Sequence, residues 1–287
     1  MKKTQTLILS TFALLTAFCS FGQISSTPIT LGTSDVIESK ILNEKRTINI
    51  YLPQDYVAND TVTYPVIYIP DGGVEEDFIH LVGIVRFNTQ PWIARFPNSI
   101  VVGIENTNRR KDFTFPVKST DFITKEGFSL EHFPQYGGSD NYISFMEKEL
   151  FPYIEKNYKG NKHRTIIGES LAGLLATSVL IKQPTLFDNY LIISPSLWWG
   201  EEELLNAKNT KLLQSIKKKT NIYIAAPNKE EYIKMHDEAV SLYDKLKVNK
   251  NLNVAFDYFP NELHSTVIHQ AVYSGLQKLY PKTAYSK

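Results

Sequence analysis

Apolar and polar positions along this chain follow two different periods. Seven short runs have the alternating or continuously apolar character of half-buried and fully buried strands. Between the later runs, apolar residues recur three and four positions apart, which is the period of an amphipathic helix. The predicted strands cover residues 46–52, 66–70, 100–104, 165–168, 190–194, 222–226 and 254–259. Strands that alternate with helices predict an α/β fold with a mostly parallel central sheet and helices on both faces.

The helical pattern is clearest in the second half of the chain, over residues 140–158, 174–181, 230–248 and 265–279. By contrast, residues 105–138 lack a clear period and are rich in Asn, Arg, Phe and Gly. Long irregular segments in compact domains usually serve a function. We therefore expect residues 105–138 to form part of the rim of a substrate site.

One strand–helix junction carries the sequence Gly168-Glu169-Ser170-Leu171-Ala172-Gly173. A serine in such a tight turn stands above the sheet, and the next backbone N–H lies at the helix N-terminus, where it can stabilise an oxyanion. The small flanking residues allow the helix to pass close to the strand. The same pattern also occurs in ordinary strand–helix turns, so the assignment of Ser170 as a nucleophile depends on partners elsewhere in the chain.

A serine hydroxyl needs a histidine to take its proton and an acid to orient that histidine. Of the six histidines, His264 lies in a short polar loop after strand 254–259, at the strand end where α/β enzymes keep their chemistry. The turn after the preceding strand carries Glu230 and Glu231, and we assign the acid to Glu230. The order Ser170, Glu230, His264 is that of an α/β-hydrolase.

An oxyanion hole needs two N–H donors, of which the residue after the nucleophile, Leu171, supplies the first. The apolar strand 66–70 runs into Asp71-Gly72-Gly73, whose glycines allow the backbone to turn toward a substrate. We therefore predict the N–H of Gly73 as the second donor. A plain turn is the alternative interpretation of these glycines.

Length and charge agree with one enzyme domain. A chain of 287 residues with 43% hydrophobic content can bury one large core, and we expect a single α/β-hydrolase catalytic domain over residues 23–287. The formal net charge is +1, and no basic stripe indicates nucleic acid as a partner. The chemistry of such a serine site needs no metal and no organic cofactor.

The first 22 residues have the composition of an export signal. Lys2 and Lys3 precede an apolar run over residues 7–18, and Ser20-Phe21-Gly22 forms a small-x-small cleavage site before Gln23. The run is too short to span a bilayer, so we expect a secreted or periplasmic protein without a membrane span. Lipid anchoring through Cys19, the only cysteine, is disfavoured by the bulky Phe18 before it.

These motifs together resemble the esterase D-like α/β-hydrolases, a family that includes siderophore (enterobactin-type) esterases, feruloyl esterases and S-formylglutathione hydrolases. The resemblance covers roughly residues 36–279 and rests on segments 64–72, 106–114, 137–142, 168–173, 187–199 and 262–265. Segment 109–114 is most similar to the siderophore esterase branch. Three positions depart from the family pattern: Ala172 replaces the second elbow glycine, Pro227 replaces the glycine before the acid, and Pro116 lies one place late.

The predicted rim of the site holds two cations and two aromatic rings, Arg109, Arg110, Trp198 and Trp199. The arginines could meet an anionic substrate or stay solvated, and one tryptophan could stack on an aromatic or sugar-like substrate or fill the core. We expect a serine ester hydrolase acting on a small-molecule or glycan-linked ester, such as a siderophore, feruloyl or acetyl-sugar ester. The alternatives are an acyltransferase of the same fold and a non-catalytic envelope protein that binds a glycan or siderophore.

Overall fold

The computed structural model describes residues 25–58 and 61–281. The predicted signal segment and Cys19 lie outside the described residues. Residues from Leu31 onward form one compact unit, to which all of the contacts below belong. No helix in the described part of the chain has both the length and the apolar character that crossing a bilayer requires.

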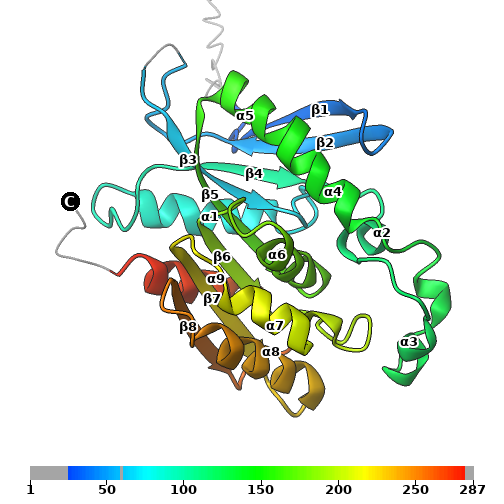
Figure 1. The fold of residues 1–287 in the computed structure, drawn as a ribbon. Coiled ribbons are helices and arrows are strands. Elements are labelled where there is room, and N and C mark those ends of the chain that lie inside the picture. The colour runs from blue at the N-terminus through cyan, green and yellow to red at the C-terminus, as the bar shows by residue number, and fades with distance from the viewer. Residues whose placement is uncertain (1–24, 59–60, 282–287) are drawn as a thin grey trace, which may run out of the picture. The chain divides into compact units, whose positions relative to one another are not determined.

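The core of the fold is a mixed, mostly parallel sheet whose eight described strands lie in the order β1-β2-β4-β3-β5-β6-β7-β8 (Figure 1). Strands β1 and β2 pair antiparallel, β2 also pairs antiparallel with β4, and the remaining pairs are parallel. The strands are β1 Thr33–Ser39, β2 Glu44–Tyr51, β3 Tyr64–Ile69, β4 Ile100–Ile104, β5 Gly160–Glu169, β6 Asn189–Ile193, β7 Thr220–Pro227 and β8 Leu252–Phe259. This architecture confirms the predicted fold class.

Helices cover both faces of the sheet. The helices of eight or more residues are α1 Phe78–Thr89, α5 Phe151–Tyr158, α6 Leu171–Lys182, α7 Ala207–Gln214, α8 Ile233–Leu246 and α9 Ile268–Leu279. Helices α1 and α9 contact each other, and α9 packs on β6 and β7, while α5, α6 and α8 pack on the opposite face (Figure 1). The shorter elements are α2 Arg109–Phe113, α3 Asp121–Lys125, α4 Ser139–Phe145, a π-helical turn η2 Met146–Leu150, and the 3-10 turns η1 Leu130–His132 and η3 Glu203–Leu205.

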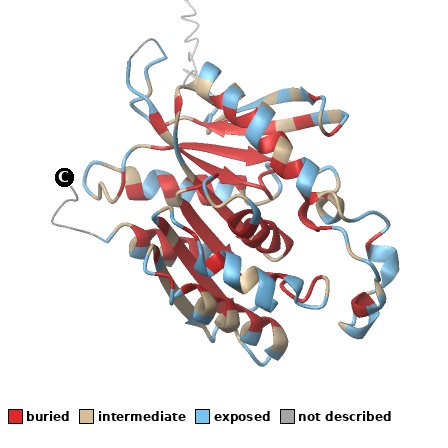
Figure 2. Ribbon diagram, viewed as in Figure 1, coloured by how far each residue is buried: buried red, intermediate tan, exposed pale blue. Residues whose placement is uncertain are grey.

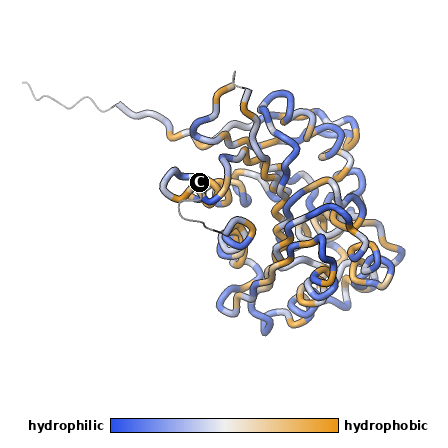
Figure 3. Tube along the Cα trace, turned by 60° about the vertical axis from the view of Figure 1, so that its left-hand side comes forward, coloured by the Kyte–Doolittle hydropathy of each residue, from blue (hydrophilic) through white to orange (hydrophobic). Residues whose placement is uncertain are grey.

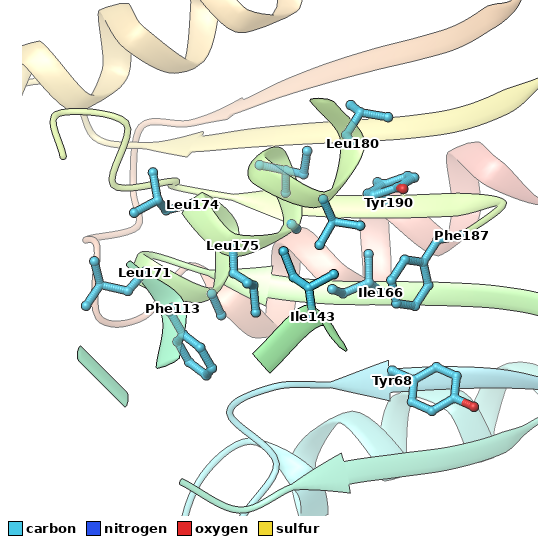
Figure 4. Close-up of a cluster of buried hydrophobic side chains, with 14 of the residues drawn as sticks. Tyr68, Phe113, Ile143, Ile166, Leu171, Leu174, Leu175, Leu180, Phe187 and Tyr190 are labelled. Atoms are coloured by element: carbon cyan, nitrogen blue, oxygen red, sulfur yellow. The ribbon is translucent and has the colours of Figure 1, made fainter. Parts of the chain in front are cut away.

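The sheet separates two hydrophobic clusters. Figure 2 shows that the central strands of the sheet are buried along most of their length. Every residue of β4 and β6 is buried, as their continuous apolar runs predict. Helix α6 is apolar on almost its whole circumference because the larger cluster surrounds it. Figure 4 shows part of that cluster, with Leu171, Leu174, Leu175 and Leu180 of α6 beside Ile166 and Tyr190 of the sheet. Figure 3 shows hydrophobic and hydrophilic residues alternating along the outer segments of the trace, as expected for elements that bury one face only.

The seven predicted strands form at their expected places, but several elements differ from the sequence pattern. Strand β1 was not predicted because it lies at the edge of the sheet and leaves most of its residues exposed or half-buried. The helix expected over 140–158 is divided into α4, η2 and α5, and α8 begins at Ile233 because Glu230 and Glu231 belong to a turn. Residues 105–138 contain α2, α3 and η1 rather than a continuous loop.

Candidate active site

Ser170 occupies a strained turn between β5 and α6. Its backbone has φ +58° and ψ −119°, a region that residues with a side chain adopt at a cost. The turn is fixed to the end of β6, because the Ser170 N–H donates to the Ile193 carbonyl (3.0 Å) and the Ser196 N–H donates to the Ser170 carbonyl (3.0 Å). The nucleophile candidate therefore stands at the carboxyl edge of the sheet, as the elbow motif predicts.

Two glycines of the elbow are sterically required. A Cβ on Gly168 would lie 2.4 Å from the carbonyl oxygen of Ala172, in the first turn of α6. A Cβ on Gly173 would lie 3.0 Å from Cα of Pro195. Ala172 lies in the first turn of α6 with its side chain buried (1% exposed), so the elbow accommodates a methyl group at this departure from the family pattern.

His264 lies in the loop between β8 and α9 and reaches Ser170. Its Nε2 lies 3.1 Å from Ser170 Oγ, and its Nδ1 lies 2.8 Å from Ser194 Oγ. The structure thus brings the predicted serine and histidine together across 94 residues of sequence. The second contact was not predicted, and Ser194, directly after β6, is 2% exposed.

The structure does not bring Glu230 to the imidazole of His264, contrary to the sequence assignment. Glu230 is exposed, and its backbone N–H donates to Asn228 Oδ1 (2.8 Å) within the turn after β7. Glu231 is the neighbour that reaches the histidine, but its Oε2 accepts the main-chain N–H of His264 (2.6 Å) rather than a ring N–H. The turn directs its carboxylate to the loop backbone, and a hydroxyl faces Nδ1 instead.

The two predicted oxyanion donors have different surroundings. Leu171 is the first residue of α6 and lines the pocket at Ser170, and the first N–H groups of a helix have no acceptor within it. The N–H of Gly73 instead donates to Glu76 Oε2 (2.6 Å), and Gly73 does not line the pocket. The prediction for Gly73 is therefore corrected, because a nearby carboxylate already satisfies its N–H. The adjacent Gly72 permits close packing, since a Cβ there would lie 2.2 Å from Cα of Gly103.

Arg109 lies against the elbow and is held by Asp71. Its Nε and Nη2 donate to the two oxygens of Asp71 (2.6 and 2.9 Å), and Nη2 also lies 3.3 Å from the carbonyl oxygen of Glu169. This bidentate geometry fixes the plane of the guanidinium. Arg109 therefore lines the pocket as a positioned cation. The exposed Arg110 also lines the pocket but forms no ion pair with a carboxylate within the described residues.

A pocket of about 420 Å³ opens above Ser170 and His264. Its walls combine aromatic, charged and hydroxyl side chains: Arg109, Arg110, Glu126, Phe128, His132, Phe133, Ser170, Leu171, Ser196, Trp198, Glu231, Tyr232, Met235 and His264. In addition to Arg109 and Arg110, segment 105–138 contributes four lining residues, which are Glu126, Phe128, His132 and Phe133. This agrees with the position expected for that segment. The volume suits a ligand of drug-like size.

The two tryptophans after β6 have separate roles in the packing. Trp198 lines the pocket and stacks on Phe128, with ring centroids 4.7 Å apart. Trp199 is fully buried, and its Nε1 donates to the carbonyl oxygen of Phe115 (2.9 Å). The prediction that Trp199 lies at the rim is corrected, because its indole fills the core beneath segment 105–138.

Comparison with known proteins agrees with this geometry. The model of the family described as "Putative esterase" matches residues 39–275. The chain belongs to this family. The esterase is 29% identical over 264 residues to the ferri-bacillibactin esterase BesA of Bacillus subtilis, covering 85% of this chain and 88% of the relative.

Two solved structures extend the comparison of the esterase. The crystal structure of an IroE-like serine hydrolase from Shewanella oneidensis matches with a TM-score of 0.79 and 30% identity, covering 87% of this chain and 80% of the other. The BES protein from Bacillus cereus matches with a TM-score of 0.75 and 26% identity, covering 91% of this chain and all of the other. The family and these relatives establish the chain as an esterase of the α/β-hydrolase fold.

The electrostatics of the esterase site favour a neutral histidine. Burial lowers the pKa of His264, the carboxylate of Glu231 opposes this shift, and the cation of Arg109 lowers the pKa further. At neutral pH the imidazole of His264 is therefore free to accept a proton.

Beside the nucleophile, burial and the repulsion of Asp77 and Asp71 raise the pKa of Glu169 to about 8. Within the described residues, no group of three or more His, Cys, Asp and Glu side chains is placed to hold a metal ion.

Sequence reasoning missed several residues of the esterase site. Ser194 follows β6 directly, so the rule that chemistry gathers at the carboxyl ends of parallel strands could have found it. Ser196, whose Oγ lies 3.2 Å from that of Ser170, belongs to the same short segment. The aromatic wall residues Phe128, Phe133 and Tyr232 carry no local signal, because their position depends on how segment 105–138 folds over α8.

Proposed function

We propose that this esterase cleaves esters through an acyl-enzyme formed on Ser170. Ser170 Oγ attacks the ester carbonyl carbon while His264 Nε2 takes the hydroxyl proton, and the N–H of Leu171 faces the developing oxyanion. Collapse of the tetrahedral intermediate expels the alcohol, which receives the proton from His264. A water molecule deprotonated by His264 then releases the acid and restores Ser170.

The observation that carries this proposal is the contact of 3.1 Å between Ser170 Oγ and His264 Nε2 in the wall of the pocket. A serine and a histidine in contact at a strained elbow have a proton-transfer geometry that ordinary surface residues lack. Labelling of the intact protein by a fluorophosphonate, followed by peptide mapping, tests the assignment of Ser170. Hydrolysis measured with and without an added alcohol then distinguishes release of the free acid from acyl transfer.

We further propose siderophore esters as the substrate class. Two features support this choice: BesA is named for a ferric siderophore, and the pocket joins an aromatic wall of Phe128, Phe133 and Trp198 to two arginines. Aromatic rings favour a flat apolar ligand, and the arginines favour negative charge. A panel of catecholate siderophores, feruloyl esters, acetyl sugars and p-nitrophenyl acetate ranks these classes by kcat/KM. Equal preference for small neutral acetyl esters would contradict the proposal.

Replacing Arg110 by alanine is expected to raise KM for a catecholate or feruloyl ester by about fivefold, which corresponds to roughly 1 kcal/mol of lost attraction. The guanidinium of Arg110 lies 5.3 Å from the ring centroid of Phe133 and borders the pocket, so it can meet an anionic substrate. KM for p-nitrophenyl acetate is expected to stay unchanged.

Lys111→Ala is the matched control for Arg110→Ala. It removes the same charge from the neighbouring position, and Lys111 does not line the pocket. Equal effects of the two substitutions on KM would show that the total charge of this surface, rather than a contact at the rim, attracts the substrate. In that case added salt would abolish the difference in KM between the anionic aromatic esters and p-nitrophenyl acetate.

We propose that the protein is exported, on the basis of Lys2, Lys3 and the apolar run over residues 7–18. Expression of the full-length chain in a bacterial host, followed by mass spectrometry of the protein from each fraction, is expected to find a mature N-terminus at Gln23 outside the cytoplasm. An uncleaved chain retained in the cytoplasm would contradict this proposal.

A further inference from the structure

The ring of His264 is held on the side away from Ser170 by a serine. Ser194 Oγ lies 2.8 Å from Nδ1, whereas the nearest glutamate, Glu231, accepts the main-chain N–H of the histidine. Ser194 is 2% exposed and sits directly after β6. In a serine–histidine–acid triad, a carboxylate receives the Nδ1–H and so selects the tautomer in which Nε2 is free to act as a base.

The backbone presents this hydroxyl in a fixed direction. Ser194 has φ +39°, a conformation that residues with a side chain rarely adopt, and its N–H donates to the carbonyl of Ala225 in β7 (2.8 Å). Strain of this kind is retained where the surrounding structure holds a residue for a purpose. Within the described residues, the side chain of Ser194 makes one hydrogen bond, which is its contact with His264.

We propose that Ser194 is the positioning residue of His264 and takes the place of the triad acid. This inference rests on the proposed function, in which His264 is the base for Ser170. The Nδ1–H of the neutral imidazole donates to Ser194 Oγ, which leaves the lone pair of Nε2 directed at the Ser170 hydroxyl. When Nε2 takes the proton, Ser194 keeps the ring in place but adds no negative charge to stabilise the imidazolium.

A neutral partner has consequences for the pH dependence of the reaction. The charged groups that face His264 are Glu231, which raises its pKa, and Arg109, which lowers it, and burial lowers it most. The net pKa lies below the ordinary value of about 6.5. Activity requires the unprotonated ring, so kcat/KM is expected to fall only as the pH drops through this lowered pKa, and the site stays active in mildly acidic solution.

Two substitutions of Ser194 test this role. Ser194→Ala removes the acceptor and is expected to lower kcat by about 10- to 100-fold with KM within twofold, a smaller loss than the roughly 10⁴-fold that follows disruption of a triad acid. Ser194→Asp supplies a carboxylate, and aspartate is among the residues that tolerate positive φ. A cavity of about 10 Å³ bordered by Ser194, Glu231 and His264 gives the longer side chain some room. The aspartate is expected to restore kcat and to shift the acidic limb of kcat/KM to higher pH.

Glu231→Gln and Glu230→Gln form a matched pair that tests the alternative. With Ser194 as the positioning residue, Glu231→Gln moves the acidic limb to lower pH and changes kcat by less than about tenfold, because the carboxylate acts on the ring only through space. Glu230→Gln has no effect on either quantity. A collapse of kcat in Glu231→Gln together with normal activity in Ser194→Ala would give the orienting role to Glu231 and overturn the inference.

A second measurement separates this inference from the proposed function. Nitrogen-15 NMR of the full-length protein labelled at histidine is expected to show the Nδ1–H tautomer for His264, and a mixture of tautomers in Ser194→Ala, whatever the effect of that substitution on stability. Absence of fluorophosphonate labelling at Ser170 in the unmodified protein would refute the proposed function itself. Normal labelling, with kcat, pH profile and tautomer unchanged in Ser194→Ala, would refute only the role of Ser194.

Discussion

Replacing Ser170 with alanine is expected to lower kcat/KM for ester hydrolysis by about 10⁴-fold or more and to abolish labelling by a fluorophosphonate. The substitution removes the hydroxyl that attacks the carbonyl in the proposed mechanism, and the remaining donors of the pocket can then stabilise only attack by water. Folding should be unaffected or improved, because the φ of +58° at this position carries strain that does not depend on the hydroxyl. Circular dichroism and thermal unfolding of the same sample check this point.

Ser196→Ala serves as the control for this prediction. Its hydroxyl lies 3.2 Å from that of Ser170 and borders the same pocket, although Ser196 itself is buried and Ser170 is half-buried, so the substitution removes the neighbouring hydroxyl and leaves Ser170 in place. We expect labelling to persist in Ser196→Ala and kcat/KM to stay within tenfold. Loss of labelling in Ser196→Ala with retention in Ser170→Ala would move the nucleophile to Ser196. His264→Ala combined with Ser170→Ala should cost no more than either alone, since the two side chains act as a unit.

The second large effect concerns stability. Asp112→Ala is expected to lower the free energy of unfolding by about 3 kcal/mol, because it leaves the buried guanidinium of Arg46 without its main partner. Both side chains of this ion pair are almost completely inaccessible to solvent, with exposures of 0% and 1%. The loss falls at the low end of the roughly 3–5 kcal/mol seen for broken buried pairs, since Glu44 also contacts Arg46.

The Arg46–Asp112 pair also connects the sheet to the rim, because Arg46 lies in β2 and Asp112 in α2, beside Arg109 and Arg110. Denaturant titration of Asp112→Ala measures the change in the free energy of unfolding. KM of the same variant for an anionic ester reports the effect on the rim. Asp140→Ala is the control, since its ion pair with Lys182 is exposed and should contribute less than about 1 kcal/mol. Equal losses in the two variants would show that burial adds nothing to the Arg46–Asp112 pair.

The parts of the site that could be predicted from sequence are those set by local pattern. Ser170 lies between an apolar strand and an apolar helix, and its flanking glycines make contacts that only small residues allow, so a few adjacent letters specify the elbow. His264 could be located because it follows a strand whose end must lie at the same edge of a parallel sheet. The positions of Ser170 and His264 depend on the alternation of strands and helices along the chain, which the hydrophobic pattern encodes.

The remaining parts depend on side-chain directions that the pattern does not encode. Glu230 and Glu231 are adjacent in one turn, which is held by hydrogen bonds from their main-chain N–H groups to Asn228, and the hydrophobic pattern does not specify this turn or the direction of either carboxylate. The donor expected at Gly73 is engaged by Glu76, three residues away, through a turn that no periodicity reveals. Trp198 and Trp199 both pack inward, and only the fold of segment 105–138 decides which ring faces the pocket. The exposed edge strand β1 gave too little apolar contrast to be predicted.

Two of the serines in this site, Ser170 and Ser194, stand at positive φ at the ends of neighbouring strands. Each such residue costs of order 1–3 kcal/mol relative to relaxed backbone, and glycine would relieve part of it. Protein engineering directed at thermal tolerance alone would therefore reward substitutions at these two positions, and under the proposed mechanism turnover would fall steeply with a change at Ser170 and moderately with a change at Ser194. If the proposed roles of Ser170 and Ser194 hold, these two positions lower the stability of the protein in return for activity, and a more stable enzyme should be sought by changing other parts of the molecule.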